Sequence, residues 1–399
     1  MPIKDAVKPY IEELTAIRRD LHQYPELGFQ EARTSSVVAE TLKKYGVDEI
    51  HTGIARTGVV GVVRGREGSN RAVGLRADMD ALPILEANDF GHRSKHDGRM
   101  HACGHDGHTT MLLGAARYLA EHRNFDGTVY LFFQPAEEGY GGAREMIKEG
   151  LFERFPVEQV YGMHNMPGLP VGSMSMRKGP CMASADEFII TINGRGAHAA
   201  MPHVSRDPVL IGAHMVTALQ SIASRRIDPI TSGVVSVTMF RASDAFNVIP
   251  DSAELRGTAR SFLPEVRDLI ETEMKRIATQ IALAFEAEAD VKFMRNYPTT
   301  VNADEETETA ARVAGAVFGE DKVDTDGDPR MGAEDFSYML NERPGCYVWL
   351  GNGDHGDKGG ANVHTPQYDF NDDAIAYGVS YWAELVETVL PREAAGRVS

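Results

Sequence analysis

Apolar strand-like runs alternate with helix-patterned segments over the first 182 residues, and this alternation most constrains the fold. The runs GVVGVV (58–63) and TVYLFF (128–133) are continuously apolar, so both faces of these strands are expected to be covered. Between such runs, Leu14, Ile17 and Leu21 fall three and four residues apart, the spacing of one helix face. The alternation predicts an α/β fold whose mostly parallel sheet carries helices on both sides.

A different pattern begins near residue 183 and ends near Asn296. It contains two strand-helix-strand sets, formed by strands 187–193, 233–240 and 252–260 and helices 207–224 and 264–285. The first pattern then returns with helix 304–318, strand 346–351 and helix 372–390. One hydrophobic core rarely serves more than ~250–300 residues, and this chain has 399. We therefore expect a discontinuous catalytic domain, 1–182 and 297–399, interrupted by a smaller α+β domain, 183–296.

Composition excludes some classes of partner. The net charge of −17, from 41 basic and 58 acidic residues, disfavours binding to nucleic acid. Only three cysteines occur, Cys103, Cys181 and Cys346, so a disulfide framework is not expected. The N-terminal segment lacks the apolar core of a signal peptide, and no stretch approaches the ~18 apolar residues of a membrane span. These features predict a cytoplasmic protein without a membrane partner.

The densest group of potential metal ligands lies in MHACGHDGH (100–108). His101, Cys103, His105 and His108 stand within eight positions, beside two glycines. Thiolate and imidazole suit zinc and similar metals. A surface loop with scattered histidines is the alternative, and spacing alone leaves open which two of the four bind.

Further donors follow apolar strands elsewhere in the chain. Glu137 and Glu138 stand in FQPAEEG (133–139), where neighbouring side chains of an extended segment point in opposite directions. One carboxylate can therefore bind a metal while the other acts as a general base, as hydrolysis requires. His164 ends the strand QVYGMHN, and His364 lies in GGANVHTP. Each of these residues taken alone is equally compatible with a structural role.

Two more acids, Asp78 and Asp80, end the strand-like segment LRADMDALP (75–83). By alternation they share one face of the strand. Histidines that bind a metal usually also contact a carboxylate, and Asp80 is a candidate for that contact. A role as a strand cap is the alternative.

Together these motifs resemble the aminoacylase and hippurate-hydrolase branch of the dinuclear metallopeptidases. The resemblance covers essentially the whole chain and rests on nine motifs in order: RRDLHQYPELGFQE (18–31), LRADMDALPI (75–84), MHACGHDGH (100–108), FQPAEEG (133–139), GMHN (162–165), GAHAAMP (196–202), NVIPD (247–251), MGAEDFSY (331–338) and NVHTP (362–366). It implies a catalytic domain interrupted by a lid that dimerises. It also implies an enzyme that hydrolyses N-acyl amino acids.

The resemblance assigns a role to each candidate. It implies five ligands for two divalent ions, which can be zinc, manganese, cobalt or nickel: Cys103, His105, Glu138, His164 and His364. Glu137 is implied as the general base, with His101 and His108 outside the ligand set. Carboxypeptidase relatives carry His-x-Asp where this chain has Asp78-Met-Asp80, and an aspartate in place of Cys103. This departure makes peptide cleavage a weaker expectation.

In the lid, the resemblance implies that His198 reaches a substrate oxygen, often across a dimer interface. Asn247 and Arg260 are implied to hold the substrate carboxylate, for which Arg offers a two-pronged donor. A homodimer or homotetramer is expected. The alternatives are a specialised deacetylase of the N-acetyl-diaminopimelate type, or a non-catalytic metal-binding protein on the same fold. A redox-sensing role for Cys103 is a further, weaker alternative.

Overall fold

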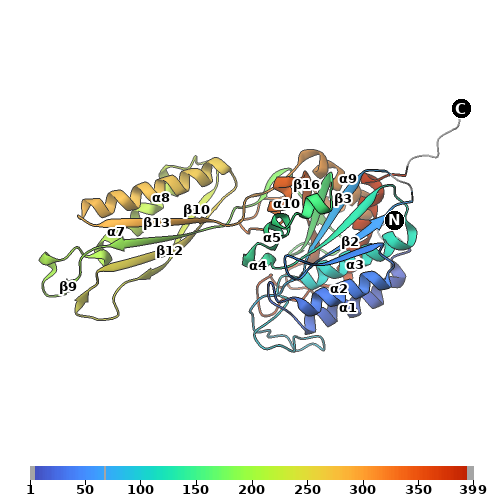
Figure 1. The fold of residues 1–399 in the computed structure, drawn as a ribbon, viewed down its shortest axis with the longest axis horizontal. Helices are drawn as coiled ribbons and strands as arrows, with labels where there is room; N and C mark the ends of the chain where they lie inside the picture. The colour runs from blue at the N-terminus through green and yellow to red at the C-terminus, as the bar shows by residue number, and fades with distance from the viewer. Residues whose placement is uncertain (1–4, 67–68, 393–399) are drawn as a thin grey trace. The chain divides into compact units, whose positions relative to one another are not determined.

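The computed structural model describes residues 5–66 and 69–392, which belong to two compact units (Figure 1). The first unit comprises Met1–Gly179, Val301–Asp328 and Asp335–Ser399, and the second comprises Pro180–Thr300 and Pro329–Glu334. The expected boundaries at 182/183 and 296/297 lie close to two of these divisions. The short return of 329–334 to the second unit was not anticipated. The outer ends of the expected catalytic domain, residues 1 and 399, lie outside the described residues.

An eight-stranded sheet forms the centre of the first unit. Its order is β1 (Glu49–Ile54), β2 (Gly58–Arg64), β4 (Thr128–Gln134), β3 (Ala72–Asp78), β5 (Gln159–Pro167), β16 (Gly345–Gly353), β6 (Met174–Ser175) and β15 (Val323–Asp324). The four central strands β4, β3, β5 and β16 are parallel, while β1 and β2 join one edge in antiparallel fashion. The mostly parallel centre was predicted from the alternation of apolar runs with helices, and the run 58–63 is completely buried in β2.

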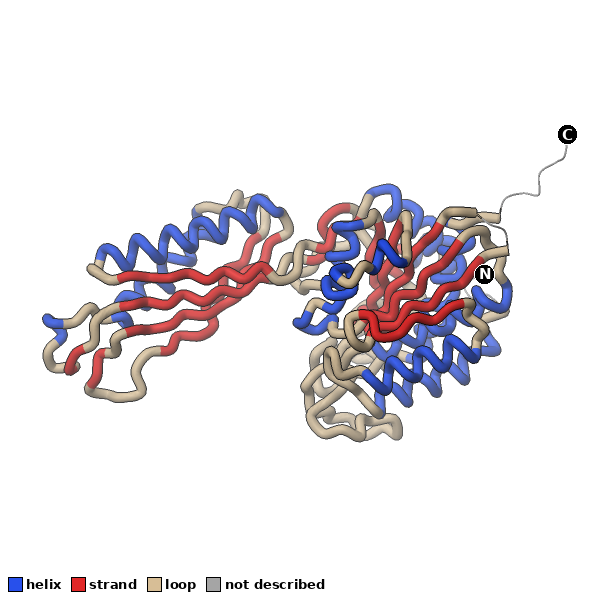
Figure 2. The backbone as a smooth tube through the Cα atoms, in the orientation of Figure 1, coloured by secondary structure: helices blue, strands red, loops and turns tan. Residues whose placement is uncertain are grey.

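Helices cover both faces of this sheet (Figure 2). On one face, α3 (His105–His122) packs against β3 and is itself covered by α1 (Ile11–Gln23), α2 (Ala32–Lys44) and α11 (Ile375–Val389).

Leu131 and Phe133 of β4 join this core, whereas Phe132 between them points to the other face and contacts Phe152 of α6 (Leu151–Arg154). The short helices α5 (Gly142–Lys148) and α10 (Ser337–Glu342) pack together, and α5 also contacts β4. The remaining long helix of this unit, α9 (Asp304–Phe318), packs on α11 and β16.

The second unit is a four-stranded antiparallel sheet with two helices. The strand order is β10 (Gly233–Arg241), β12 (Ser252–Ser261), β8 (Asp186–Asn193) and β13 (Glu288–Arg295). Alternate residues of β12 are buried, and α7 (Pro208–Arg225) and α8 (Pro264–Ala284) pack on this sheet. Beyond the sheet, β9 (Ala197–His198) pairs with β11 (Val248–Ile249). Strand β13 and the short strand pair were not predicted from the sequence.

No helix among residues 5–66 and 69–392 is long and apolar enough to cross a membrane. The three cysteines are all buried and none forms a disulfide.

Candidate metal centre

The candidate ligands meet at the carboxyl ends of the central strands. Glu137 and Glu138 follow β4 in the tight turn α4 (Glu137–Tyr140), and His164 lies near the end of β5. Asp80 comes two residues after β3. In open α/β sheets this edge is where ligands bind, because the loops that follow parallel strands converge there.

Gly104 brings Cys103 and His105 into the centre. It adopts the left-handed region, with φ of 95°, immediately before α3 begins. A Cβ atom at this position would lie only 2.1 Å from Oδ1 of Asn165 and 2.5 Å from the hydroxyl of Tyr368. Only glycine therefore allows the chain to turn here with the two ligands on either side of the turn.

Cys103, His105 and His164 form one donor group. Their ligand atoms lie within 4.8 Å of one another, and Sγ of Cys103 is 3.2 Å from Nε2 of His164. The Nδ1 atom of His164 donates to the carbonyl oxygen of Asn165 at 2.6 Å. This bond fixes the ring orientation and leaves Nε2 directed at the site, a common arrangement for histidines that bind metals.

Glu138 joins this group to His364. One donor group contains Cys103, Glu138 and His364, and another contains His105, Glu137 and Glu138. Oε1 of Glu138 lies 3.2 Å from Nε2 of His364 and 4.0 Å from Nε2 of His105. Glu138 thus shares donor groups with Cys103, His105 and His364, and His164 joins them through Cys103 and His105.

The loop that carries His364 is tied to the Cys103 loop. The backbone N–H of His364 donates to the carbonyl oxygen of Ala102 at 2.7 Å, and His364 itself has a positive φ of 61°. A histidine rarely adopts this region unless its surroundings hold it there. Its side chain is half-exposed, whereas His105 and Cys103 are buried.

The residues present fit a pair of metal ions. Within the described ranges, neither ring nitrogen of His105 nor Oε1 of Glu138 makes a hydrogen bond of good geometry, although Asp80 lies 3.3 Å from Nδ1 of His105 and His364 lies 3.2 Å from Oε1 of Glu138. Buried polar atoms normally have a bonding partner, so a group of ligand atoms that lack well-formed hydrogen bonds favours a bound cation. The mixture of thiolate, imidazole and carboxylate suits zinc and neighbouring transition metals.

The electrostatics of the site favour a cation. Burial lowers the pKa of His105, but the carboxylates of Asp78, Asp80 and Glu138 outweigh burial and raise this pKa to about 10. Burial, reinforced by Glu138 and Glu137, raises the pKa of the Cys103 thiol well above its ordinary value. The negative surroundings therefore keep these donors protonated in the absence of metal, and divalent ions would displace the protons.

Asp80 lies behind His105. Its Oδ1 is 3.3 Å from Nδ1 of His105, so it contacts the ring nitrogen that faces away from Glu138. It also accepts hydrogen bonds from the backbone N–H groups of Glu137 (2.9 Å) and Glu138 (3.0 Å). One buried carboxylate thus orients both a predicted ligand and the turn that carries the predicted base.

The other candidates of the same motifs lie outside this group. His108 Nδ1 is 2.6 Å from Oδ1 of Asp78, and its Nε2 lies against Asn165. A donor group of Asp78, His105 and His108 exists, but Asp78 also pairs with Arg76 at 2.8 Å. His101 belongs to none of the donor groups found among the described residues.

Asp335 supports Glu137, a contact that the sequence did not reveal. The N–H of Asp335 lies 3.4 Å from Oε1 of Glu137, and the Asp335 carboxylate accepts from Arg76 and Gln134. Its motif, MGAEDFSY, was part of the resemblance, but nothing in its spacing connects it with residue 137.

The three lid candidates lie in the second unit, at two places. His198 is in β9, and the N–H of Ala199 donates to the carbonyl oxygen of Asn247 at 3.0 Å, so these two candidates are neighbours. Arg260 lies near the end of β12, whose pairing with β8 joins Ala259 to Asp186 and Ser252 to Asn193. The eight residues of β8 span roughly 25 Å, at about 3.3 Å per residue, so Arg260 is at the opposite end of the sheet from His198.

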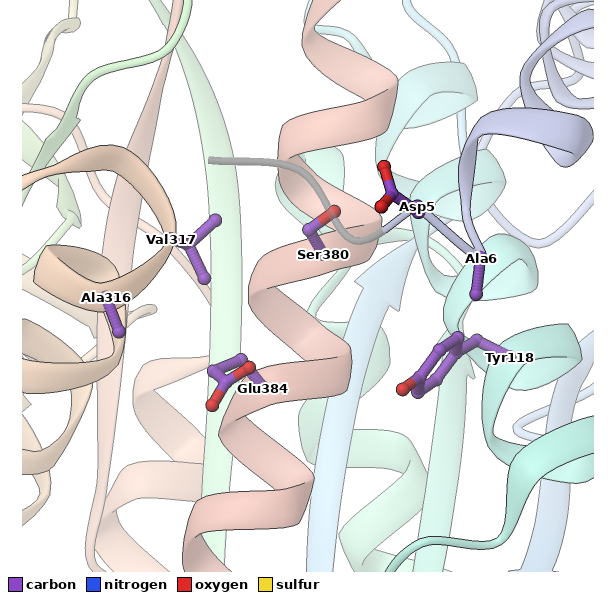
Figure 3. A pocket seen from close by; sticks show the side chains of 7 residues that line it. All are labelled: Asp5, Ala6, Tyr118, Ala316, Val317, Ser380 and Glu384. Atoms are coloured by element: carbon purple, nitrogen blue, oxygen red, sulfur yellow. The ribbon is translucent and has the colours of Figure 1, made fainter. Parts of the chain in front are cut away.

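A separate cavity of about 400 Å³ lies in the first unit (Figure 3). It is lined by residues that precede the first helix and by residues of α3, α9 and α11: Asp5, Ala6, Tyr118, Ala316, Val317, Ser380 and Glu384. None of the predicted site residues lines it.

Similar proteins carry related chemistry. The chain is 42% identical to a hippurate hydrolase of Campylobacter jejuni over 94% of its length and 95% of that protein. It is 39% identical to an N-acetylcysteine deacetylase of Bacillus subtilis (96% and 99% covered) and 40% identical to thermostable carboxypeptidase 1 of Saccharolobus solfataricus (94% and 95%).

Solved structures and family models agree with these relatives. A dinuclear metal-binding peptidase of the M20 family from Bacillus subtilis matches with a TM-score of 0.84 and 35% identity, covering 96% of this chain and 99% of that one. The model of peptidase family M20/M25/M40 matches residues 74–388. The chain therefore belongs to peptidase family M20/M25/M40, as the nine motifs predicted.

Proposed function

We propose that this protein is a metal-dependent amidohydrolase that cleaves N-acyl amino acids into a carboxylic acid and a free amino acid. The observation that carries the proposal is the position of Glu137 beside the donors Cys103, His105 and Glu138. A site that only bound metal would need no buried carboxylate next to a complete ligand set. The relatives that act on hippurate and N-acetylcysteine support a small N-acyl substrate.

In this mechanism Glu137 is the proton carrier. Two divalent ions, held by the five ligands, would polarise the scissile carbonyl and lower the pKa of water toward ~7. Glu137 accepts the proton of the attacking water and delivers it to the leaving amine. Asp80 holds His105 and the Glu137–Glu138 turn in position through the three contacts described above.

Recognition of the amino-acid half is assigned to the lid. Arg260 and Asn247 bind the free carboxylate, and His198 donates to the developing oxyanion, an effect worth roughly 10²–10³-fold in rate. Because Arg260 is roughly 25 Å from the other two within one copy, all three can serve one substrate only if two copies contribute. We therefore propose that His198 and Asn247 act on the site of a second copy.

The exposed apolar residues of the second unit support such an assembly. Phe240 and Met239 on the edge strand β10 are 41% and 43% exposed, and Val248 of β11 is 47% exposed. An open strand edge with apolar side chains pairs readily with another chain. A homodimer, alone or within a tetramer, would cover it. The free buried cysteines fit a cytoplasmic location, which we also propose.

The test is release of free amino acids from a panel of N-acetyl, N-benzoyl and longer N-acyl amino acids. Enzyme stripped by a chelator is assayed before and after addition of zinc, manganese, cobalt or nickel. Release that returns with metal supports the proposal, and the preferred acyl group separates a hippurate hydrolase from a deacetylase. Dipeptides in the same panel test carboxypeptidase activity. A protein that binds two ions yet cleaves nothing would favour the non-catalytic alternative.

A further inference from the structure

The turn that presents the base and a metal ligand is fixed by two buried carboxylates. The N–H groups of three consecutive residues, Ala136, Glu137 and Glu138, all donate to these carboxylates. Ala136 donates to Oε1 of Glu31 at 2.8 Å, and the other two donate to Asp80 at 2.9 and 3.0 Å. Asp80 contacts the metal centre directly, whereas Glu31 has no role in the mechanism described so far.

Ala136 needs this support because its backbone is strained. Its φ of 54° and ψ of 46° place it in the left-handed region, which alanine seldom occupies. Such a conformation is unfavourable for a residue with a Cβ atom and persists only where the surroundings impose it. Ala136 is fully buried, and the hydrogen bond to Glu31 holds its N–H. The direction in which residues 137 and 138 leave β4 depends on this strained residue.

The surroundings of the Glu31 side chain favour its hydrogen bond to Ala136. Its side chain is fully buried, and its second oxygen accepts from Oγ1 of Thr57 at 2.6 Å. Within the described ranges its carboxylate bonds to Ala136 and Thr57 and forms no ion pair, and burial raises its pKa to about 7. Although Glu31 precedes α2, its side chain does not cap that helix. Neither ion pairing nor helix capping therefore explains a carboxyl group kept at this buried position.

We propose that Glu31 is a positioning residue for amide hydrolysis, which fixes Ala136 and thereby aims Glu137 at the substrate water and Glu138 at the metals. The proposal rests on the proposed function. It gives a role to the motif RRDLHQYPELGFQE, whose last residue is Glu31. An error of about 1 Å in the position of a reacting group can lower the rate by roughly 10²-fold.

Three variants separate positioning from simple stability. Glu31→Ala removes both acceptors. Glu31→Gln keeps an oxygen for the N–H of Ala136, and its amide nitrogen can donate to Thr57 instead. Glu26→Ala is the matched control, because Glu26 lies in the same motif and accepts from the backbone N–H groups of Arg33 and Thr34 without touching the turn.

Each variant is loaded with Co²⁺, and three quantities are measured: kcat per bound metal, KM for the best substrate of the panel, and the visible absorption spectrum of Co²⁺. For Glu31→Ala we expect kcat to fall about 10- to 100-fold with little change in KM, together with an altered Co²⁺ spectrum. Glu31→Gln should recover most of the lost kcat. Glu26→Ala should lower the Tm but keep the wild-type kcat and spectrum.

The outcomes distinguish this proposal from the proposed function. If the wild-type enzyme is active and Glu31→Ala keeps its kcat per metal and its spectrum, positioning by Glu31 is wrong. A Gln variant as slow as the Ala variant would also overturn it. If the wild type cleaves no substrate, the proposed function is wrong, and the Co²⁺ spectrum then tests only whether Glu31 fixes the turn: an altered spectrum in Glu31→Ala supports this, and an unchanged one contradicts it.

Should Glu31→Ala fail to fold, Thr57→Val carries the test. This near-isosteric change removes the hydroxyl that anchors Glu31 and leaves the carboxylate itself in place. A severalfold loss of kcat per metal with an altered spectrum supports the proposal, and wild-type values for both contradict it.

Discussion

The stability of the first unit should fall as the pH rises above neutrality, because of one buried histidine. His22 of α1 is fully buried between two carboxylates: Nδ1 is 2.8 Å from Oδ2 of Asp106, and Nε2 is 3.2 Å from Oε1 of Glu86. Burial lowers the pKa of His22, but these two partners outweigh it and raise the pKa to about 9, from an ordinary 6.5.

The size and sign of the effect follow from this shift. At about 1.4 kcal/mol for each pH unit, a pKa of about 9 instead of 6.5 corresponds to about 3 kcal/mol. Because the folded-state pKa is the higher one, this contribution is fully present below pH 6.5 and is lost as the pH rises through 9. We therefore expect the wild type to lose about 3 kcal/mol of unfolding free energy over this range through His22.

The assay compares urea unfolding of the wild type and His22→Gln at about pH 6 and about pH 9.5, on either side of the transition. The chain has two tryptophans, Trp349 and Trp382, both buried in the first unit, so their fluorescence reports the unfolding of that unit. His22→Gln should lose about 3 kcal/mol less than the wild type between the two pH values.

A control variant tests whether the pH effect is specific to His22. His51→Gln removes a partly exposed histidine that pairs with Glu49 at 3.2 Å, and it should keep the wild-type pH dependence. If His22→Gln loses as much stability as the wild type over this range, His22 is not held as an imidazolium and the reasoning is wrong.

Three further predictions concern the metal centre and the lid. Asp80→Asn should weaken metal binding by about 10- to 100-fold and lower kcat, because the two N–H groups of the turn donate to different oxygens of Asp80 and an amide has only one oxygen. Competition with a chelator measures the metal affinity, and initial rates measure kcat. Cys103→Ser should bind zinc more weakly in the same competition, since it loses the thiolate, and unchanged affinity would remove Cys103 from the ligand set. A mixture of His198→Ala and Glu137→Gln copies, each inactive alone, should regain about a quarter of wild-type activity after exchange into dimers. Persistent inactivity of a mixture shown to exchange would contradict the shared site.

The central fold was predictable because its strands are continuously apolar. Strands β2 and β4 begin at the residues expected from the sequence, and β16 begins one residue earlier. Strands β1 and β13 were missed because they are edge strands: β1 reads EIHTGI, and β13 leaves every other residue exposed. A polar edge strand resembles a loop in sequence, since only its pairing with a neighbour defines it.

The ligand candidates could be predicted from the sequence for a different reason. Cysteine and histidine are scarce enough that their clustering around Gly104 stands out, and the resemblance then selected Cys103 and His105 from four possibilities. The supporting contacts were not predictable. Glu31 and Asp335 lie 105 and 198 residues from the groups they touch, Ala136 and Glu137, and no local pattern records such long-range hydrogen bonds. The strain at Ala136 was equally hidden, because alanine gives no sign of a positive φ.

The measurement that tests the account most directly is the turnover of Glu137→Gln, with its metal content determined on the same sample. Gln is close to Glu in size but cannot carry the proton, and Glu137 is not among the five proposed ligands. The account predicts two bound ions per chain and a loss of kcat of about 10²- to 10⁴-fold, the range for a removed general base. Wild-type kcat in a fully loaded Glu137→Gln enzyme would contradict it.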